Sequence, residues 1–590
     1  MLPKGVVDQE LRVDLLVLGS EGAGAKAAIE AYDLGVTNSV MVTKGFFGKS
    51  GVTLMAGRAV QAALGHMDPH DNPEVHLKDT VEVGGYLTNQ KLSERLVTLA
   101  LTEIPKLETW GARFQKEGDK FFQIQLPGAS YPRSCTSAVQ QGGLEWRRAY
   151  KAQARKRRLR VLENVFVTSL MTKGGRVCGA TAVNLADGQF YLLRAKAVVL
   201  ACGGATQLFP HTDAALEATG DGMALAYRAG CDLVDMEFHM FFPFGVLWPT
   251  GFQGQIWPAD FRYRLRAKFY NNLGEEFLLR YQPEWGNWGL RDPTSQAIYL
   301  ENLYGRGSPH GGAYLSINHL PRNMIDNFIA KFHRNRKKWY WTKLQQLGVD
   351  LRTDAIEVGP VSHYTMGGVR VDECCRTTLQ GLFAAGEVAG GMDGAERLDG
   401  GPAITWTQTM GLICAQESAA HLQGAELPEI DAQQVREARE RAYQPLARSE
   451  GPRGYEAKRL VKQLMGAACT FVRDEARLRE GLARLARLRE EVLPRLSANP
   501  TRRYNRDWVH ALEAQNLADV AELVLHAALT RRESRKAHFR SDFPKEDPAW
   551  IKNVILRRGG DGRLEVQIVD PVMTKVFPPV TTPSGRDGSA

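Results

Sequence analysis

A glycine-rich string at 19–24, GSEGAG, constrains the fold of this chain more than any other feature. It follows an apolar run at 13–18, as expected of a buried parallel strand, and precedes an alanine-rich stretch at 23–34 that predicts a helix. A second apolar run at 40–42 completes a strand–helix–strand unit. Because the N-terminus of such a helix offers free N–H groups and the positive end of its dipole to a phosphate, the unit predicts a dinucleotide-binding α/β domain.

The glycines fit the phosphate-binding pattern G-x-G-x-x-G only in part. Gly19 and Gly24 occupy its outer positions, but Glu21 stands where a glycine normally allows close approach to a phosphate. Gly22 is the residue that can take over part of this role. Taken alone, the string is also compatible with a structural turn that binds nothing.

Two more apolar runs end in glycines, at 198–204 and 382–390. Asp221 and Glu387 directly follow glycines, and carboxylates at such turns can accept hydrogen bonds from ribose or ribityl hydroxyls. Three units of this kind, spread across the chain, indicate a two-dinucleotide-binding flavoprotein fold in which an extended FAD contacts distant segments.

Length and composition define the broad class of protein. With 590 residues the chain should form several domains, and 44% apolar with 24% charged residues is an ordinary globular balance. The net charge is +9, but the densest basic cluster, at 151–160, is best explained as a solvated helix face, and no nucleic-acid-binding module accompanies it. We therefore expect no nucleic-acid binding, and an acidic protein partner matches the charge better.

Neither a metal site nor a membrane span is expected. The eight cysteines include no C-x-x-C pair, which argues against a zinc or iron–sulfur site in this chain and fits a reducing compartment. No apolar run approaches the length of a membrane span, and the first residues lack the apolar core of a signal peptide. We expect a cytoplasmic protein that reaches a membrane, if at all, through partner subunits.

Two further strings carry a family resemblance: HYTMGG at 363–368 and RESRKAHFR at 532–540, in which Lys536 replaces a glycine. With the glycine units they resemble the flavoprotein subunits of the succinate dehydrogenase, fumarate reductase and L-aspartate oxidase family over nearly the whole chain. The resemblance implies an FAD-binding Rossmann-like α/β domain in two parts, an inserted α+β capping domain and a C-terminal helical bundle. The implied boundaries are 1–236 and 346–425 for the FAD-binding domain, 237–345 for the capping domain, 426–545 for the helical domain and 546–590 for the tail.

The resemblance also implies which residues contact FAD. They lie in the glycine-rich turns, in the loop after the second strand and at the start of a later helix: Gly19, Gly22, Gly24, Lys44, Ser50, Asp221, Glu387, Ala403 and Ile404. Family members with covalent FAD carry a histidine directly after the serine of this loop, where this chain has Gly51. Because glycine has no ring nitrogen to form that bond, non-covalent FAD is expected.

The family transfers a hydride between flavin N5 and one carbon of an activated C–C bond, an arginine moves the proton, and a separate iron–sulfur subunit exchanges the electrons. The substrate-binding histidine and arginine of the family match His363 and Arg397. Counting along the chain puts the proton-donating arginine at Arg264, with Arg262 and Arg266 as alternatives. A basic surface strand is the non-catalytic explanation for these three residues.

The other substrate-binding positions depart from the family. Its Q-F-H-P-T-G segment can be aligned in two ways, which put either Phe242 or Trp248 at the position of a carboxylate-binding histidine. The loop around the substrate-binding arginine gains Asp393, Glu396 and Asp399, and negative charge there would weaken the attraction for an anion. We therefore predict a small-molecule substrate that is larger, more apolar or less anionic than a C4 dicarboxylate.

Two alternatives stay open. The chain could be a genuine fumarate reductase or succinate dehydrogenase flavoprotein whose pocket uses substitute residues. It could also be an electron relay whose flavin meets no organic substrate. An L-aspartate oxidase role is disfavoured by the same lost residues.

Overall fold

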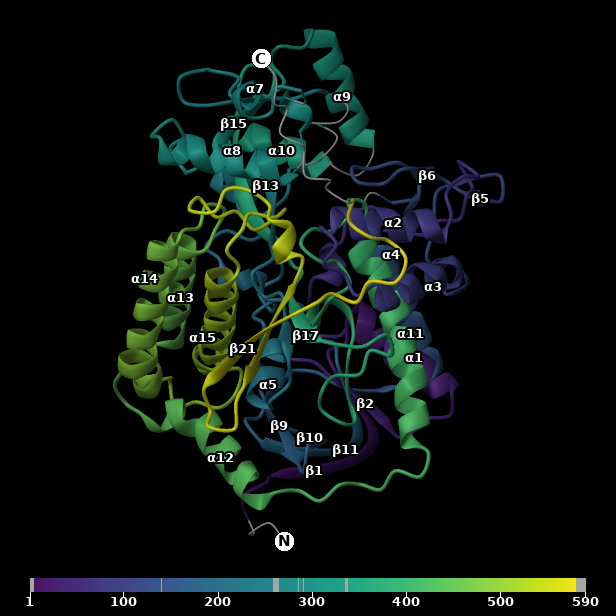
Figure 1. The fold of residues 1–590 in the computed structure, drawn as a ribbon, viewed down its shortest axis with the longest axis vertical. Helices are drawn as coiled ribbons and strands as arrows, with labels where there is room; N and C mark the ends of the chain where they lie inside the picture. Colours follow the sequence, from purple (N-terminus) through teal and green to yellow (C-terminus); the bar gives the residue numbers. More distant parts are fainter. Residues whose placement is uncertain are drawn as a thin grey trace, which may run out of the picture.

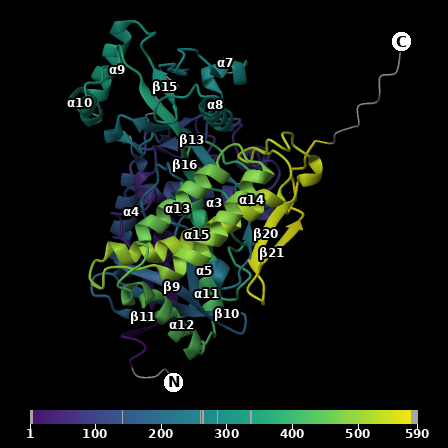
Figure 2. The same cartoon turned by 90° about the vertical axis from the view of Figure 1, so that its left-hand side faces the viewer.

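The computed structural model describes residues 5–139, 141–257, 261, 265–284, 286–289, 291–334 and 338–579. Figure 1 shows three parts: a purple and blue part rich in strands at the bottom, a teal part at the top, and a group of green and yellow helices on the left. Figure 2, turned by a quarter, shows the helices in front of the strands and the teal part again at the top. The predicted fold class, an FAD-binding α/β domain with an inserted α+β unit and a helical bundle, is confirmed.

The central sheet has the strand order β8-β2-β1-β11-β10-β9, with β18 paired to β11. Its strands are β1 (Gln9–Leu18), β2 (Ser39–Val42), β8 (Arg160–Leu162), β9 (Val165–Lys173), β10 (Arg176–Asn184), β11 (Phe190–Leu200) and β18 (Leu382–Ala384). β1 is parallel to β2 and β11, and β11 is parallel to β18. Helices α1 (Gly22–Asp33) and α11 (Pro402–Leu422) pack side by side against this sheet (Figure 1).

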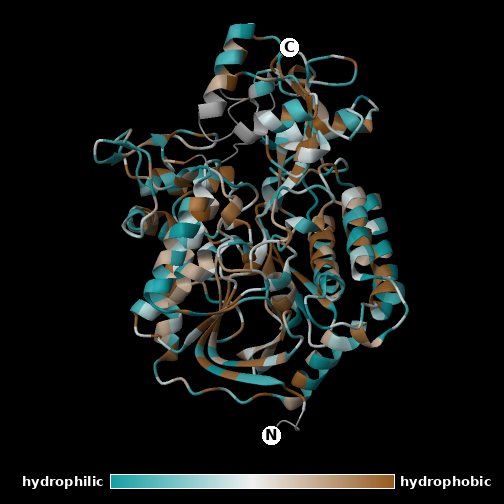
Figure 3. Ribbon diagram, turned by 180° about the vertical axis from the view of Figure 1, so that it is seen from behind, coloured by the Kyte–Doolittle hydropathy of each residue, from teal (hydrophilic) through white to brown (hydrophobic). Residues whose placement is uncertain are grey.

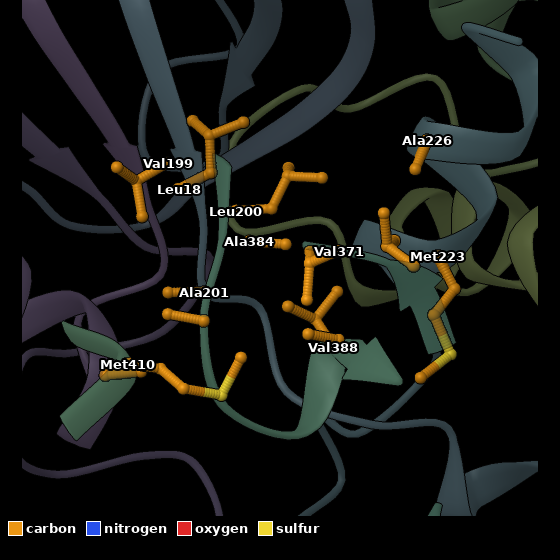
Figure 4. Packing of buried hydrophobic residues seen from close by; sticks show 14 of the residues in the cluster. Leu18, Val199, Leu200, Ala201, Met223, Ala226, Val371, Ala384, Val388 and Met410 are labelled. Atoms are coloured by element: carbon orange, nitrogen blue, oxygen red, sulfur yellow. The ribbon is translucent and has the colours of Figure 1, made fainter. Parts of the chain in front are cut away.

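The core gathers at the carboxyl ends of the parallel strands. Figure 4 shows Leu18, Leu200 and Ala384, from three neighbouring strands, beside Val388 and Met410. All five side chains are fully buried. Burying one leucine stabilises the fold by about 1.5–3 kcal/mol, so the strand ends that carry the glycine turns are firmly held.

The upper part is built on an antiparallel sheet with the order β13-β16-β15-β14. Its strands are β13 (His239–Trp248), β14 (Lys268–Tyr270), β15 (Ala313–Ser316) and β16 (Ile356–Thr365). Its helices are α7 (Leu278–Tyr281), α8 (Arg291–Leu303), α9 (Arg322–Arg334) and α10 (Lys338–Gln346), with α8 packed on β13. Because β16 follows residue 345, this sheet includes a strand from the range that the resemblance gave to the FAD-binding domain.

The left-hand helices are α12 (Ala432–Tyr443), α13 (Gly454–Ala468), α14 (Glu475–Arg487) and α15 (Arg506–Thr530). α13 and α14 both pack against α15, which is buried along most of its length. Figure 3 shows α15 as mainly hydrophobic, whereas the outer helices carry hydrophilic faces. An apolar helix between other elements is typical of a bundle core.

The end of the chain adds a hairpin, β20 (Asn553–Arg558) and β21 (Leu564–Val569). The hairpin extends a sheet with the order β19-β17-β12-β20-β21, which also contains β12 (Leu233–Val234), β17 (Gly368–Arg370) and β19 (Ala389–Gly390). Within the described ranges, no helix is both long enough and apolar enough to cross a bilayer.

Candidate functional site

The first glycine turn is sterically closed to other residues. Gly19 has φ +113°, and a Cβ there would lie 2.0 Å from the carbonyl oxygen of Ala201 at the end of β11. A Cβ on Gly24 would lie 2.1 Å from the carbonyl oxygen of Gly19. Because no other side chain fits at either position, these glycines bring the ends of β1 and β11 and the start of α1 into direct contact.

The start of α11 lies against the same turn. A Cβ on Gly22 would lie 2.8 Å from the hydroxyl oxygen of Thr407, and a Cβ on Gly386 would lie 3.1 Å from the Cβ of Ala23. Ala403 and Ile404 lie in the first turn of α11. The structure thus brings the first and third glycine units and the predicted α11 residues to one place.

The loop after β2 carries Glu21 on one of its glycines. Glu21 precedes α1 with an extended backbone and its side chain caps no N–H group of the helix. Instead it lies over Gly51, where an added Cβ would be 2.5 Å from the Cγ of Glu21. Burial, supported by the charge of Glu217, raises the pKa of Glu21 to about 8.

Lys44 and Asp221, both predicted to contact FAD, form an ion pair. The Nζ of Lys44 is 2.7 Å from a carboxylate oxygen of Asp221 and 2.9 Å from one of Glu513. Asn516 donates a hydrogen bond of 2.8 Å to the second oxygen of Asp221. Glu513 and Asn516 belong to α15, far along the chain and outside any motif, so sequence analysis missed them.

Ser50 closes the loop after β2 rather than pointing away from it. Its hydroxyl accepts a hydrogen bond of 2.9 Å from the N–H of Phe46 and lies 3.0 Å from the carbonyl oxygen of the same residue. The serine therefore shapes the loop that contains Gly51.

His363 lies on β16 with its ring oriented by an acid. Its Nδ1 is 2.7 Å from a carboxylate oxygen of Asp213, and a proton on Nδ1 leaves Nε2 for another partner. The ring of Phe242 lies 5.4 Å from the ring of His363. Trp248 lies at the other end of β13, opposite Glu357. This geometry favours the alignment without an insertion, in which Phe242 takes the histidine position.

Arg397 is almost fully buried. Its guanidinium lies over the ring of Tyr364 at 4.3 Å, and its Nη2 is 3.7 Å from the sulfur of Met240. Its Nε has no hydrogen-bond partner among the residues that the structure describes. A buried guanidinium with a free donor can bind an anion.

The acids around Arg397 are largely neutralised by Arg291 of α8. Arg291 is 3.2 Å from Glu396 and 3.0 Å from Asp399. The expectation that these two acids weaken Arg397 is therefore wrong, because they already have a cation. Asp393 accepts a hydrogen bond of 2.7 Å from the indole N–H of Trp406. Sequence analysis missed Arg291, which stands in no recognised string.

Glu387 lies close to both predicted substrate-binding residues. It accepts a hydrogen bond of 3.0 Å from the N–H of Thr365, and a Cβ on Gly204 would lie 2.1 Å from its carboxylate. Burial raises the pKa of Glu387 to about 7, and the charges of His363 and Arg397 oppose the rise. The second glycine unit, Glu387 and the substrate residues therefore face one region.

The predicted proton donor Arg264 and its alternative Arg262 lie outside the described residues. Arg266 is exposed, in a left-handed conformation with φ +50°, and lines a surface pocket of the upper part with Lys268 and Glu276. The alignment that pointed to Arg264 is the one that the position of Phe242 disfavours. In the part of the chain that is described, no cluster of three potential metal ligands occurs.

Comparison with protein families assigns this arrangement. The family model of the FAD binding domain matches residues 14–402, and that of the fumarate reductase flavoprotein C-terminal region matches residues 458–584. The chain belongs to the fumarate reductase and succinate dehydrogenase flavoprotein family. This flavoprotein is an FAD-dependent oxidoreductase, as its motifs predicted.

Relatives of the flavoprotein match it from end to end. A CoM/CoB fumarate reductase subunit of Methanothermobacter marburgensis is 35% identical over 546 residues, which is 92% of this chain and 97% of the relative. The L-aspartate oxidase of Streptomyces coelicolor is 31% identical over 96% of this chain and 95% of its own. A chain of the apo Mycobacterium smegmatis Sdh1 complex superposes with a TM-score of 0.85 at 32% identity, covering 95% of this chain and 94% of that one.

The residues of the flavoprotein fit FAD. Gly19 and Gly24 leave the backbone bare at the strand ends, and the first turn of α1 contains no acid and no capping side chain. The N-terminus of α1 therefore keeps free N–H groups for a pyrophosphate.

Proposed function

We propose that this flavoprotein binds FAD without a covalent bond and acts on an activated C–C or similar bond of a substrate other than a small C4 dicarboxylate. The observation that carries the substrate part is the ring of Phe242, 5.4 Å from that of His363. A phenyl ring offers no hydrogen bond to a carboxylate, whereas histidine does. Phe244, in the threonine position of the family, packs on Phe242 at 5.3 Å and extends the apolar surface.

One anionic group of the substrate can still be held. His363 presents Nε2 because Asp213 holds Nδ1, and Arg397 keeps a free Nε. Both side chains carry donors suited to a single carboxylate or carbonyl oxygen. A substrate with one polar head and an apolar remainder suits these residues.

When bound, FAD supplies two-electron hydride chemistry. Gly51 supports non-covalent binding because it provides no nucleophile at the linkage position, and Glu21 fills the space beside it. The upper part, through β13 and α8, covers the loop of Arg397 and excludes water from the reacting region.

We further propose that a separate iron–sulfur subunit exchanges the electrons. The chain has no C-x-x-C pair of its own, and the relative from Methanothermobacter marburgensis is named as one component of a multi-component reductase. Phe46 and Met55, on the loop and turn that follow β2, are both close to half exposed. Exposed apolar side chains near the cofactor loop suit a protein partner.

The substrate proposal is tested with dye-coupled turnover. Purified protein with FAD is assayed with reduced viologen against fumarate and against larger unsaturated monocarboxylates. We expect slow turnover of fumarate, and F242H should raise fumarate turnover at the expense of the monocarboxylates. Fast fumarate reduction by the unaltered protein would contradict the proposal. Acid precipitation, with release of yellow flavin into the supernatant, tests the non-covalent part separately.

A second candidate function has its own support. The relative at 35% identity is named a fumarate reductase, so fumarate itself remains the alternative substrate, held by residues that replace the lost histidine. The same assay separates the two, because this candidate expects fumarate to be the better substrate and F242H to bring no gain.

A further inference from the structure

Two departures from the family pattern meet in space. Glu21 replaces the middle glycine of the phosphate-binding string, and Gly51 replaces the histidine that forms the covalent link. Although thirty positions lie between them, a Cβ on Gly51 would be 2.5 Å from the Cγ and 2.9 Å from the Cδ of Glu21. The side chain of Glu21 therefore occupies the volume that a residue at 51 would need.

The surroundings of Glu21 come from three segments. The turn η1 (Thr53–Met55) contributes the hydroxyl of Thr53, and the loop before it contributes the N–H of Gly48. Helix α4 (Gly142–Lys156) contributes the cation Arg147 and the phenol of Tyr150. The acid Glu217 approaches from the segment before α5 (Asp221–Arg228). One cation thus faces two carboxyl groups.

A negative charge at this position opposes FAD. Glu21 stands directly before α1, whose N-terminal N–H groups and dipole are the part of the fold suited to a pyrophosphate. A second anion there would compete for the same donors and repel the phosphates. A neutral carboxylic acid removes the repulsion and offers an O–H donor.

We propose that Glu21 is a cofactor-binding residue that acts as a neutral, hydrogen-bond-donating carboxylic acid, so that binding of FAD requires a proton on this side chain. The proposal rests on the non-covalent FAD of the proposed function. Glu21 is half-buried beside Gly51, and burial raises its pKa to about 8 in the protein without cofactor. Below that pH the acid already carries its proton; above it, FAD binding must take a proton from solvent.

The sign of the pH dependence follows from linkage. If only the protonated form binds FAD, the Kd for FAD is constant below about pH 8 and rises about tenfold per pH unit above it. Glu217 helps to raise the pKa of Glu21, so E217Q should move the onset to lower pH and keep the slope. E21Q keeps a neutral donor at the same place and should give a Kd that does not change with pH.

The experiment measures FAD binding itself. Apoprotein of the full chain is titrated with FAD by flavin fluorescence from about pH 6 to about pH 9.5, for the unaltered protein, E21Q and the matched neighbour variant E217Q. Calorimetry in two buffers of different ionisation enthalpy, above pH 8, counts the protons. We expect about one proton taken up per FAD by the unaltered protein and none by E21Q.

Two results would overturn the proposal. One is a Kd that stays constant with pH in the unaltered protein, and the other is an E21Q profile with the same slope. E21G, which restores the family glycine, keeps the test decisive where E21Q does not fold, since its profile must also be flat. Flavin retained by the acid-denatured protein would overturn non-covalent binding together with this proposal, whereas released flavin with a flat profile overturns this proposal alone.

Discussion

Arg291 donates a hydrogen bond of 2.7 Å from Nη2 to the carbonyl oxygen of Arg397. The donor stands at the start of α8 in the upper part, and the acceptor lies in the loop that follows β19. The same guanidinium pairs with Glu396 and Asp399 on either side of Arg397. One buried cation therefore fixes the loop, and the two acids hold it in place.

Removal of this cation should loosen the loop of Arg397. R291Q leaves two nearly buried acids without a partner, which costs about 3–5 kcal/mol when an ion pair is broken in this way. We expect a lower midpoint of thermal unfolding and faster amide exchange in residues 393–399, read by mass spectrometry. In a double-mutant cycle, E396Q and D399N added to R291Q should recover part of the loss. Unchanged exchange in R291Q would contradict this role.

Gly19 should not tolerate alanine. G19A places a methyl group 2.0 Å from a backbone oxygen in addition to the strain of a positive φ, about 1–3 kcal/mol. We expect protein that purifies without flavin or fails to fold, measured by the ratio of flavin to protein absorbance. G35A is the matched control, because Gly35 has φ +92° but nothing within 4 Å of an added Cβ. Equal flavin content in the two variants would refute the steric argument.

The ion pair of Lys44 with Glu513 should make stability depend on pH. Burial alone would raise the pKa of Glu513, but Lys44, His510 and Lys458 hold it well below its usual range. Because the folded-state pKa is depressed, the stabilisation is complete above the unfolded-state pKa of about 4.3 and is lost as the pH falls through the folded-state value. At pH 7, E513Q should cost about 3–5 kcal/mol.

The check for Glu513 is thermal unfolding of both proteins at neutral and at acidic pH. The difference between the unaltered protein and E513Q should shrink in acid. E480Q, which breaks an exposed pair of α14 with Arg484, should cost about 0.5 kcal/mol or less at any pH. A constant difference for E513Q across pH would speak against the ion pair as its cause.

Asp213 should matter to turnover through His363. D213N replaces the acceptor 2.7 Å from Nδ1 and no longer favours the tautomer that leaves Nε2 free. We expect turnover to fall by about tenfold or more, with FAD content unchanged and a shifted pH profile. D187N, at a surface turn, is the control. An unaltered pH profile in D213N would argue for a purely structural acid.

What the sequence predicted and what it missed follow from the range of the interactions. The turn of Gly19 and Gly24 was predictable because strand, glycine and helix are consecutive, and the family strings then gave the domain order. The partners Arg291, Asp213 and Glu513 were not, since each comes from a distant segment and meets its target only in the tertiary fold. The two alignments of Phe242 and Trp248 could be separated only by the pairing of β13 with β16.

The pairing of β13 with β16 has a mechanical consequence. One end of the ladder, Trp248 opposite Glu357, belongs to the upper sheet, while the other end, at Thr365, receives the N–H of Ala205 on its hydroxyl and gives its own N–H to Glu387. The two strands form a stiff lever that passes from one part of the molecule into the other. Any rocking of the upper part is geared to the position of His363, so that access to the flavin and alignment of the substrate histidine change together.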